Sequence, residues 1–158
     1  PISLIDCFPS IIEAVGGHLV EEDVDLPGKS IWEIAQTPNQ DRFAFSEYHA
    51  VGSENAIYML RNRQYKYIYY VDDPVQLFDL QADPEENQDL SNLPEYQEIL
   101  QFFDKELSNI VDPEGVDAKA KEDQRSKISE NGGEAKVRQR GAFDNSPVPG
   151  EDPLFRRH

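Results

Sequence analysis

The aromatic side chains of this chain are concentrated in its first 112 residues, and this limits where a folded core can form. Fourteen of the sixteen Phe, Tyr and Trp residues precede residue 113, and only Phe143 and Phe155 follow it. Residues 1–112 carry 22 acidic and 6 basic side chains, whereas residues 113–158 carry 9 of each. Because aromatic residues dominate small cores, we expect a core-forming domain at 1–112 and a polar extension at 113–158.

Composition excludes several functional classes. A formal net charge of −16 argues against sequence-independent binding to nucleic acid, which requires clustered Lys and Arg. No apolar run approaches the roughly 20 residues that span a bilayer, so we expect no membrane partner. A single cysteine, Cys7, excludes an internal disulfide framework and a multi-cysteine zinc site.

The first 40 residues read as two short helices separated by loops. Between residues 3 and 15 apolar side chains recur at helical spacing, and Gly16-Gly17 provides a helix stop. Pro9 inside this pattern indicates a kink or a helix start. A second short helix is expected at 29–34.

Four strands and an amphipathic helix follow. Residues 43–49, 56–61, 65–71 and 76–80 are strand-like, and the second and third form a hairpin around Asn62-Arg63-Gln64. Asn92 and Glu95 form a capping-box pattern before an apolar stripe that runs from Tyr96 to Ile110. The fold class is therefore α+β: a small antiparallel sheet with a helix packed against it.

The extension at 113–158 has too few apolar side chains for a core. Helices are expected at about 117–129 and 135–140, before a Pro- and Gly-rich end that looks extended. We expect this extension to wrap a neighbour or to stay mobile.

Common catalytic motifs are missing from these residues. The sequence has no nucleophile elbow, no phosphate-binding glycine loop and no histidines four apart on a helix. Carboxylates between Asp83 and Asp89 lack the ligand spacing of an EF-hand, so a solvated acidic turn is the preferred interpretation.

His49 is the histidine with the most functional promise. It ends a predicted strand, two residues after Glu47 and on the same face. An imidazole at a strand end can donate hydrogen bonds to an anionic or hydroxylated ligand. The alternative is a histidine with a purely structural role.

Several stretches closely resemble the C-terminal part of type I sulfatases, in the right order along the chain. That family has the patterns S-L-x-D-x-(F/Y)-P-T, L-(P/D)-G-x-S, M-x-R-x-x-x-Y-K-Y and L-(Y/F)-D-L-x-x-D-P-x-E. The stretches that match these four patterns are SLIDCFPSI at 3–11, LPGKS at 26–30, MLRNRQYKYI at 59–68 and LFDLQADPEE at 77–86. SEYH at 46–49 also resembles a stretch of that family. The tail also resembles an extension of bacterial choline-sulfatase-like members.

The resemblance implies a hydrolase of sulfate esters in the alkaline phosphatase superfamily. Such enzymes use a formylglycine, made from cysteine or serine in C/S-x-P-x-R, together with a calcium ion. Both groups belong to the larger N-terminal part of the family, so the resemblance implies that this chain binds neither and is inactive alone. The start at Pro1, and not at methionine, favours the same interpretation, that of a fragment.

Cys7-Phe8-Pro9 looks like the start of a formylglycine motif, but Ile11 stands where that motif has arginine. By its order along the chain the segment matches a later helix of the family. We therefore expect Cys7 to be a core residue and not a nucleophile.

In the family, the strand that carries S-E-Y-H ends near the mouth of the active site. The resemblance thus implies that Glu47 and His49 bind substrate and help to select the leaving alcohol, without being catalysts. The implied partners are a small sulfate ester, the missing catalytic domain and, through the extension, another subunit. Two alternatives remain: a phosphonate monoester or phosphodiester hydrolase of the same superfamily, and a non-catalytic acidic binding module.

Overall fold

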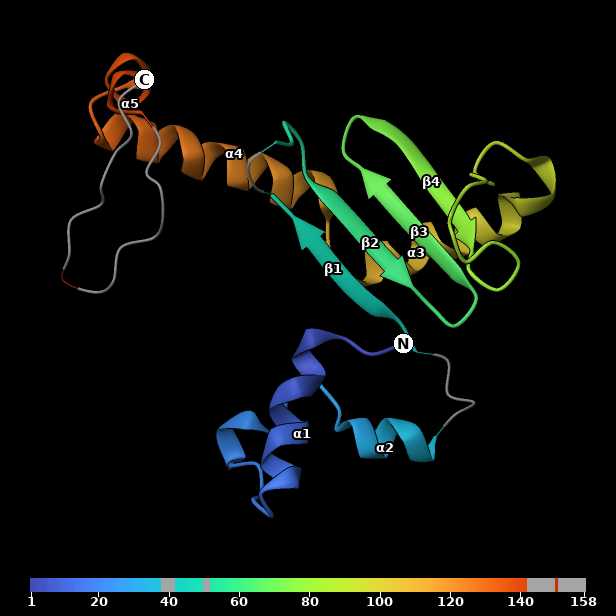
Figure 1. Cartoon of the computed structure of the whole chain (residues 1–158). Coiled ribbons are helices and arrows are strands. Elements are labelled where there is room, and N and C mark those ends of the chain that lie inside the picture. Colours follow the sequence, from blue (N-terminus) through green and yellow to red (C-terminus); the bar gives the residue numbers. More distant parts are fainter. Residues whose placement is uncertain (38–41, 50–51, 142–149, 151–158) are drawn as a thin grey trace. The chain divides into compact units, whose positions relative to one another are not determined.

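A computed structural model describes residues 1–37, 42–49, 52–141 and 150 (Figure 1). The chain divides into two compact units, Pro1–Pro113 and Glu114–His158. All strands of the described residues lie in the first unit. The second unit contains most of one long helix and the whole of one short helix. The α+β class expected from the sequence is confirmed.

A four-stranded antiparallel sheet forms the centre of the first unit, with the strands in the order β1-β2-β3-β4. Its strands are β1 (Ala44–Tyr48), β2 (Ile57–Arg61), β3 (Tyr65–Tyr70) and β4 (Asp73–Asp79). The β2–β3 hairpin closes on Asn62, whose Oδ1 accepts hydrogen bonds from the backbone N–H groups of Gln64 (2.9 Å) and Tyr65 (2.7 Å). This Asx-type turn explains why a polar triplet separates the two strands.

Strand β4 is longer than the sequence suggested. The sequence predicted the fourth strand at 76–80, but β4 already begins at Asp73. Only Val71 and Asp72 connect it to β3, and Asp72 takes a left-handed φ of 65° that aspartate tolerates. Pro74 fits because β4 lies at the edge of the sheet, where a missing N–H costs little.

Helix α3 (Gln97–Ile110) covers one face of this sheet (Figure 1). A buried core joins the two layers and includes Tyr58, Leu60, Tyr67, Leu77, Phe103 and Leu107, each at most 2% exposed. The strand register places the four sheet residues on one face, because Leu60 pairs with Tyr67 and Tyr67 with Leu77.

The start of α3 differs from the expected capping box. A 3₁₀ turn, η3 (Pro94–Tyr96), precedes the helix, and Tyr96 occupies the cap position without a side-chain cap hydrogen bond. Pro94 favours this turn because its fixed φ suits a first helical position. Asn92 instead donates to the Ser91 hydroxyl.

The N-terminal segment (residues 1–37) contains η1 (Leu4–Asp6), α1 (Cys7–Ala14), η2 (Glu21–Asp23) and α2 (Ile31–Gln36). Helix α1 ends at the expected glycine stop. Gly16 adopts a φ of 71°, and Gly17 N–H donates to Ile12 C=O at 2.9 Å.

In the second unit, α4 (Pro113–Glu130) extends further at both ends than the predicted helix, and α5 (Glu134–Arg140) follows Gly132-Gly133. Most of the side chains of α4 and α5 are exposed. The end of the chain that we expected to be extended lies outside the described residues, apart from Gly150. No helix among the described residues is long and apolar enough to span a bilayer.

Candidate functional site

Glu47 and His49 meet at the end of β1, as the two-residue period of the strand predicts. Glu47 Oε2 lies 3.4 Å from His49 Nε2. Glu47 pairs with Tyr58 across the β1–β2 ladder, so the two residues lie on the same face of the sheet as the core. Strand β1 ends at Tyr48, so His49 lies directly after the end of the strand.

The environment of His49 is asymmetric. Its ring approaches the Tyr58 ring edge-on, with centroids 5.5 Å apart. Its side chain is 23% exposed and that of Glu47 is 48% exposed, so the carboxylate end of the pair faces solvent. His49 Nδ1 is buried and has no hydrogen-bond partner among the described residues.

This arrangement defines what the pair can do chemically. An exposed carboxylate accepts hydrogen bonds from hydroxyl or ammonium groups, and an imidazole donates to anions when it is protonated. Tyr58, the residue beneath His49, is itself fixed: it is fully buried and its hydroxyl donates to Pro113 C=O at 3.1 Å. The buried Tyr58 side chain therefore gives His49 a fixed packing partner, and the exposed Glu47 carboxylate can contact a polar ligand.

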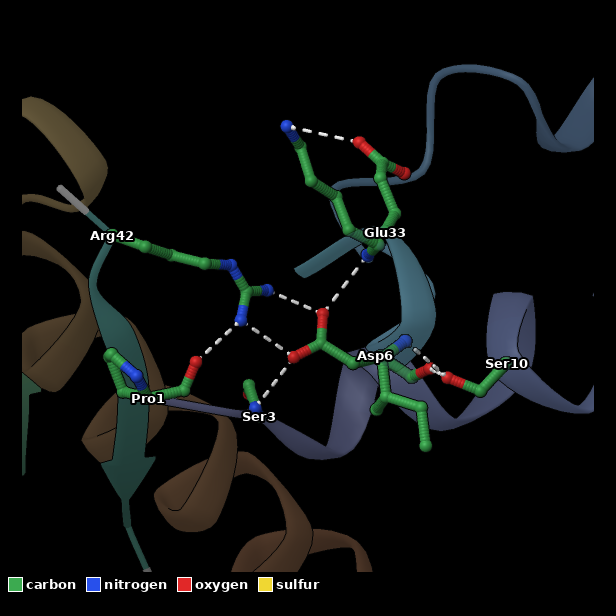
Figure 2. Close-up of polar contacts among 8 residues, drawn as sticks. Pro1, Ser3, Asp6, Ser10, Glu33 and Arg42 are labelled. Carbon is green, nitrogen blue, oxygen red and sulfur yellow. Dashed lines mark hydrogen bonds and ion pairs between the residues drawn. The ribbon is translucent and has the colours of Figure 1, made fainter. Parts of the chain in front are cut away.

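A second polar cluster was missed by the sequence analysis. Its centre is the fully buried Asp6 carboxylate, shown in Figure 2. Ser3 N–H donates to Oδ2 at 2.7 Å, Lys29 N–H donates to Oδ1 at 3.0 Å, and Arg42 contacts both oxygens, including Oδ2 at 2.8 Å. Arg42 also donates to Pro1 C=O at 3.0 Å.

Buried hydroxyls extend this cluster from α1 to α2. Ser10 Oγ donates to Asp6 C=O at 2.5 Å and accepts from Ile31 N–H at 3.0 Å. Ser30 is buried at the cap of α2 and accepts from Trp32 N–H. Between them Gly28 passes so close to η1 that an added Cβ would lie 2.1 Å from Ile5 C=O. The SLIDCFPSI and LPGKS motifs therefore form one interlocked unit.

Burial and hydrogen bonding act in opposite directions on Asp6. Burial raises its pKa, but the hydrogen bonds from Arg42, Lys29 and Ser3 and the charge of Arg42 outweigh this effect, so the pKa lies below its usual value of 3.8. Asp6 is thus an ionised anchor for the N-terminal segment and for the start of β1. No feature of this cluster points to a reacting group.

The expectation that Cys7 lies in the core is wrong, because Cys7 is exposed. The helix turns Asp6 and Ser10 inward, and the next residue along a helix points about 100° away. The apolar stripe of the first helix is also largely exposed, with Ile11 at 62% and Val15 at 75%.

The acidic stretch after β4 is a set of turns. Asp79 Oδ1 accepts from Gln81 and Ala82 N–H, and Asp83 Oδ2 accepts from Gln88 N–H. Asp89 Oδ1 accepts from Leu77 and Ser91 N–H at 3.1 and 2.9 Å. Asp79, Asp83 and Asp89 each stabilise a turn by accepting hydrogen bonds from backbone N–H groups.

The donor set does not fit the calcium and formylglycine that the sulfatase resemblance implies for a whole enzyme. Among the described residues, no group of three or more His, Cys, Asp or Glu side chains could hold a metal ion. Cys7 and Pro9 lack the arginine of the modification motif, since position 11 is isoleucine.

Comparison with known proteins identifies the family. Residues 2–112 match the family described as N-sulphoglucosamine sulphohydrolase, C-terminal. Arylsulfatase K of Danio rerio is 33% identical over 121 residues, which cover 71% of this chain and 22% of that protein. Choline-sulfatase of Rhizobium meliloti (strain 1021) is 31% identical over 127 residues, which cover 78% of this chain and 25% of that protein.

Solved structures share the fold. A putative sulfatase from Bacteroides thetaiotaomicron VPI-5482 superposes with a TM-score of 0.56 at 24% identity, covering 77% of this chain and 25% of that one. A structure described as a 2-O GAG sulfatase gives the same score and identity and covers 77% of this chain and 26% of that one.

The chain spans about a quarter of the length of these relatives. The family match covers the sheet, α3 and the N-terminal segment, including all the motifs that carried the resemblance. The chain therefore belongs to the family of N-sulphoglucosamine sulphohydrolase C-terminal domains, among the sulfatases of the alkaline phosphatase superfamily.

Proposed function

We propose that residues 1–112 are the C-terminal subdomain of a sulfuric ester hydrolase whose nucleophile and metal site lie in another part of the polypeptide. The observation that carries this proposal is the family match over residues 2–112. In a complete enzyme of this kind, a formylglycine and a calcium ion supply the nucleophile and the stabilisation of charge. This chain contributes the wall of the substrate site and no catalytic group.

Glu47 and His49 are the residues of this chain that contact substrate in the proposal. Their position at the end of β1, the solvent-exposed Glu47 carboxylate and the buried Tyr58 against the His49 ring support this role. The substrate is a sulfate ester whose alcohol carries hydroxyl groups, which donate to a carboxylate, or a cationic ammonium group, which a carboxylate attracts by its charge. One relative named above is described as a choline-sulfatase, and choline carries such a cationic group.

The test uses the complete polypeptide encoded by the gene. It is assayed with an aryl sulfate, choline sulfate, sulfated monosaccharides and a phenyl phosphonate monoester. Sulfate ester hydrolysis is expected, and residues 1–158 alone are expected to be inactive. Preference for the phosphonate would instead assign a phosphonate hydrolase, and no hydrolysis of any ester would leave a binding module.

The substrate role of the pair is tested in the same enzyme. His49→Ala and Glu47→Ala should each lower kcat/KM for the best ester by about tenfold or more, which corresponds to about 1.4 kcal/mol of transition-state binding. Ser46→Ala is the matched control, because Ser46 is exposed on the same strand with its side chain on the other face. An unchanged kcat/KM for every sulfate ester in His49→Ala would remove His49 from the site.

Residues 113–158 are an extension that contacts another subunit or the remainder of the enzyme in this proposal. The support is that few side chains of α4 and α5 are buried. Truncation after residue 122, which keeps Pro113 and the buried Asp117, should change the oligomeric state, or the stability of the complete enzyme, as measured by light scattering and thermal unfolding. A truncated enzyme unchanged in both would contradict the proposal.

A further inference from the structure

One ring nitrogen of His49 has a role that the proposed function leaves open. Nδ1 is buried and has no hydrogen-bond partner among the described residues, whereas Nε2 lies 3.4 Å from Glu47 Oε2. Buried polar side-chain atoms are nearly always hydrogen-bonded, so an exception of this kind needs a physical reason. Here it restricts where the imidazole ring can carry its proton.

The contacts of His49 distinguish the three protonation forms of its ring. With the proton on Nδ1 alone, a buried N–H has no acceptor and the Nε2 lone pair faces the Glu47 carboxylate. The doubly protonated ring donates to Glu47 but keeps the same buried, unpaired N–H. Because such an N–H carries the full cost of its desolvation, the geometry favours the neutral ring with its proton on Nε2. Its one N–H then donates to Glu47 Oε2.

The surroundings of the ring favour the same neutral form. Tyr58 is fully buried, and its ring meets the His49 ring edge-on with the centroids 5.5 Å apart. A positive charge on the His49 ring would lose hydration on this side. The Glu47 side chain is 48% exposed, so solvent screens the charge of its carboxylate. The pair therefore carries one net negative charge, that of Glu47.

Basic side chains of the sheet lie only at the end away from this pair. The arrowhead of β1 and the β2–β3 turn mark the two opposite ends of the sheet in Figure 1. Arg61 pairs with both Ala44 and Lys66, so it lies beside the first residue of β1 and close to the β2–β3 turn. The basic side chains of the four strands and of the described residues between them are Arg61, Arg63 and Lys66.

The end of the sheet that carries His49 is acidic. Its charged side chains in the strands and in the described residues between them are exposed and all negative: Glu47, Glu54, Asp72 and Asp73. Exposed charges of one sign raise the local concentration of ions of the opposite sign. This end of the sheet therefore attracts cations and repels anions.

We propose that Glu47 and His49 recognise a cationic group of the substrate alcohol, a quaternary or protonated ammonium. The Glu47 carboxylate attracts the cation, and His49 Nε2–H holds that carboxylate in place, so His49 also acts as a positioning residue. An alcohol that carries a carboxylate or a second sulfate is repelled by the same charge. This inference rests on the proposed function for the ester substrate itself, and it adds the charge of the alcohol.

The test measures charge selection in the complete polypeptide encoded by the gene. Choline sulfate is compared with its uncharged carbon analogue, in which a tert-butyl group replaces the trimethylammonium group. Sulfated glucosamine and its N-acetyl derivative form a second pair of cationic and neutral esters. In at least one pair, kcat/KM for the cationic ester should exceed that for the neutral ester by about tenfold or more. The ratio should fall as the salt concentration is raised.

Glu47→Gln keeps the shape of the side chain and removes its charge, so the ratio should fall to within about threefold of one. Glu98→Gln is the matched control, because it removes the same charge from an exposed position in the first turn of α3. That turn lies at the other end of the sheet, since the ring of Tyr96 contacts that of Tyr65. The control should leave the ratio within about twofold of the wild-type value.

Three outcomes of these assays would overturn the proposal. The first is a wild-type enzyme that prefers neutral or anionic esters. The second is an equal fall of the ratio in Glu47→Gln and Glu98→Gln. The third is a Glu47→Gln enzyme with lower Tm and an unchanged ratio, which would show that Glu47 pairs with a basic side chain of the protein.

Two amide substitutions test the role of Nε2 separately. The side-chain N–H of glutamine lies near the position of Nε2, and that of asparagine lies near the position of Nδ1. His49→Gln should therefore keep most of the preference for the cationic ester, and His49→Asn should lose it. In ¹⁵N NMR of the histidine-labelled enzyme at neutral pH, His49 should have one protonated and one unprotonated ring nitrogen. Two protonated nitrogens, or equal losses in both variants, would overturn the positioning role.

Failure of this inference is distinguishable from failure of the proposed function. Hydrolysis of sulfate esters without preference for a cation overturns the charge selection alone. If no ester is hydrolysed, the proposed function fails, and binding of tetramethylammonium to the complete polypeptide, measured by NMR, decides the inference. Binding that Glu47→Gln weakens would support the cation site, and absence of binding would overturn it.

Discussion

Two regions of one compact unit reach order by opposite means. In the sheet and α3, aromatic and aliphatic side chains from strands and helix meet inside, and Phe103 contacts the rings of Phe43, Tyr65 and Tyr67. In the N-terminal segment a buried carboxylate and two buried hydroxyls take the central position. The comparison teaches that local order does not require a local apolar core, provided that every buried polar group is hydrogen-bonded.

The difference extends to what each region needs from outside. The sheet and α3 bury their own apolar surface, so hydrophobic burial stabilises them directly. The N-terminal segment gains little from burial within this chain, because its apolar side chains stay in water. Its stability therefore depends on the hydrogen bonds of the Asp6 cluster.

The largest expected effect breaks the apolar core. Phe103→Ala removes a fully buried ring from the centre of the sheet and α3 and should cost about 3–5 kcal/mol of unfolding free energy. Urea unfolding of residues 1–158, followed by circular dichroism, measures the loss. Phe102→Ala is the control, because that ring is 47% exposed and its loss should cost much less. Equal losses would mean that the core is not where the structure places it.

The second prediction breaks the polar core. Asp6→Asn leaves Arg42, whose side chain is only 15% exposed, without its carboxylate and should cost about 3 kcal/mol. The control is Glu33→Gln, which removes an exposed ion pair with Lys29 and should cost less than about 1 kcal/mol. Hydrogen exchange resolves where the loss falls: protection should fall in residues 1–37 while the sheet keeps its protection. Equal loss in both regions would contradict their separate stabilisation.

The pH dependence of stability follows from the same carboxylate. The pKa of Asp6 is lower in the folded chain than its usual value of 3.8, so its stabilising effect is present above that pH and is lost as pH falls through the folded value. Wild-type stability should therefore drop below pH 3.8, and Asp6→Asn should drop less. Asp79 has a lowered pKa too, because hydrogen bonds from Gln64, Ala82 and Gln81 outweigh its burial, so part of the drop should remain in the variant.

A smaller effect is expected at the point of closest backbone approach. Gly28→Ala puts a Cβ 2.1 Å from Ile5 C=O, so η1 and the 27–30 loop must separate. Overpacking of this kind should cost about 1–3 kcal/mol. In Gly17→Ala the new Cβ would meet Ile12 atoms at 3.3 Å, which requires only a small adjustment. Thermal unfolding that ranks Gly17→Ala as the more damaging variant would contradict the packing of the loop on η1.

These contrasts explain which features the sequence could predict. The strands and α3 were predictable because their partners lie within the chain, so a period of two or 3.6 residues also indicates what is buried. The two-residue period of a strand also predicts that Glu47 and His49 lie on the same face. The burial of His49 Nδ1 and the contact of its ring with Tyr58 could not be predicted in this way, because Tyr58 belongs to a neighbouring strand. The Asp6–Arg42 pair joins residues 36 positions apart, and no local pattern marks it.

The first helix shows the limit of such patterns. Its apolar spacing correctly indicated a helix, and the place of the segment in the sulfatase pattern led to the expectation that Cys7 lies in the core. The structure buries Asp6 and Ser10 instead and leaves Ile11 and Val15 exposed. A sequence pattern identifies the apolar side of a helix, but it does not say where the covering surface comes from.

Alkylation of Cys7 tests the exposure of the N-terminal segment without any substitution. It is the only cysteine of the chain, and it is exposed on the N-terminal segment. An accessible thiol reacts at a rate set by its own chemistry, whereas a buried thiol must wait for local opening. Alkylation of native residues 1–158 by iodoacetamide should therefore proceed within about tenfold of the rate for the same chain in urea.

A rate 100-fold or more below that of the chain in urea would contradict this exposure. It would show that Cys7 is buried within residues 1–158, as the sequence suggested. The thiol thus reports on the N-terminal segment without altering the polar cluster beneath it.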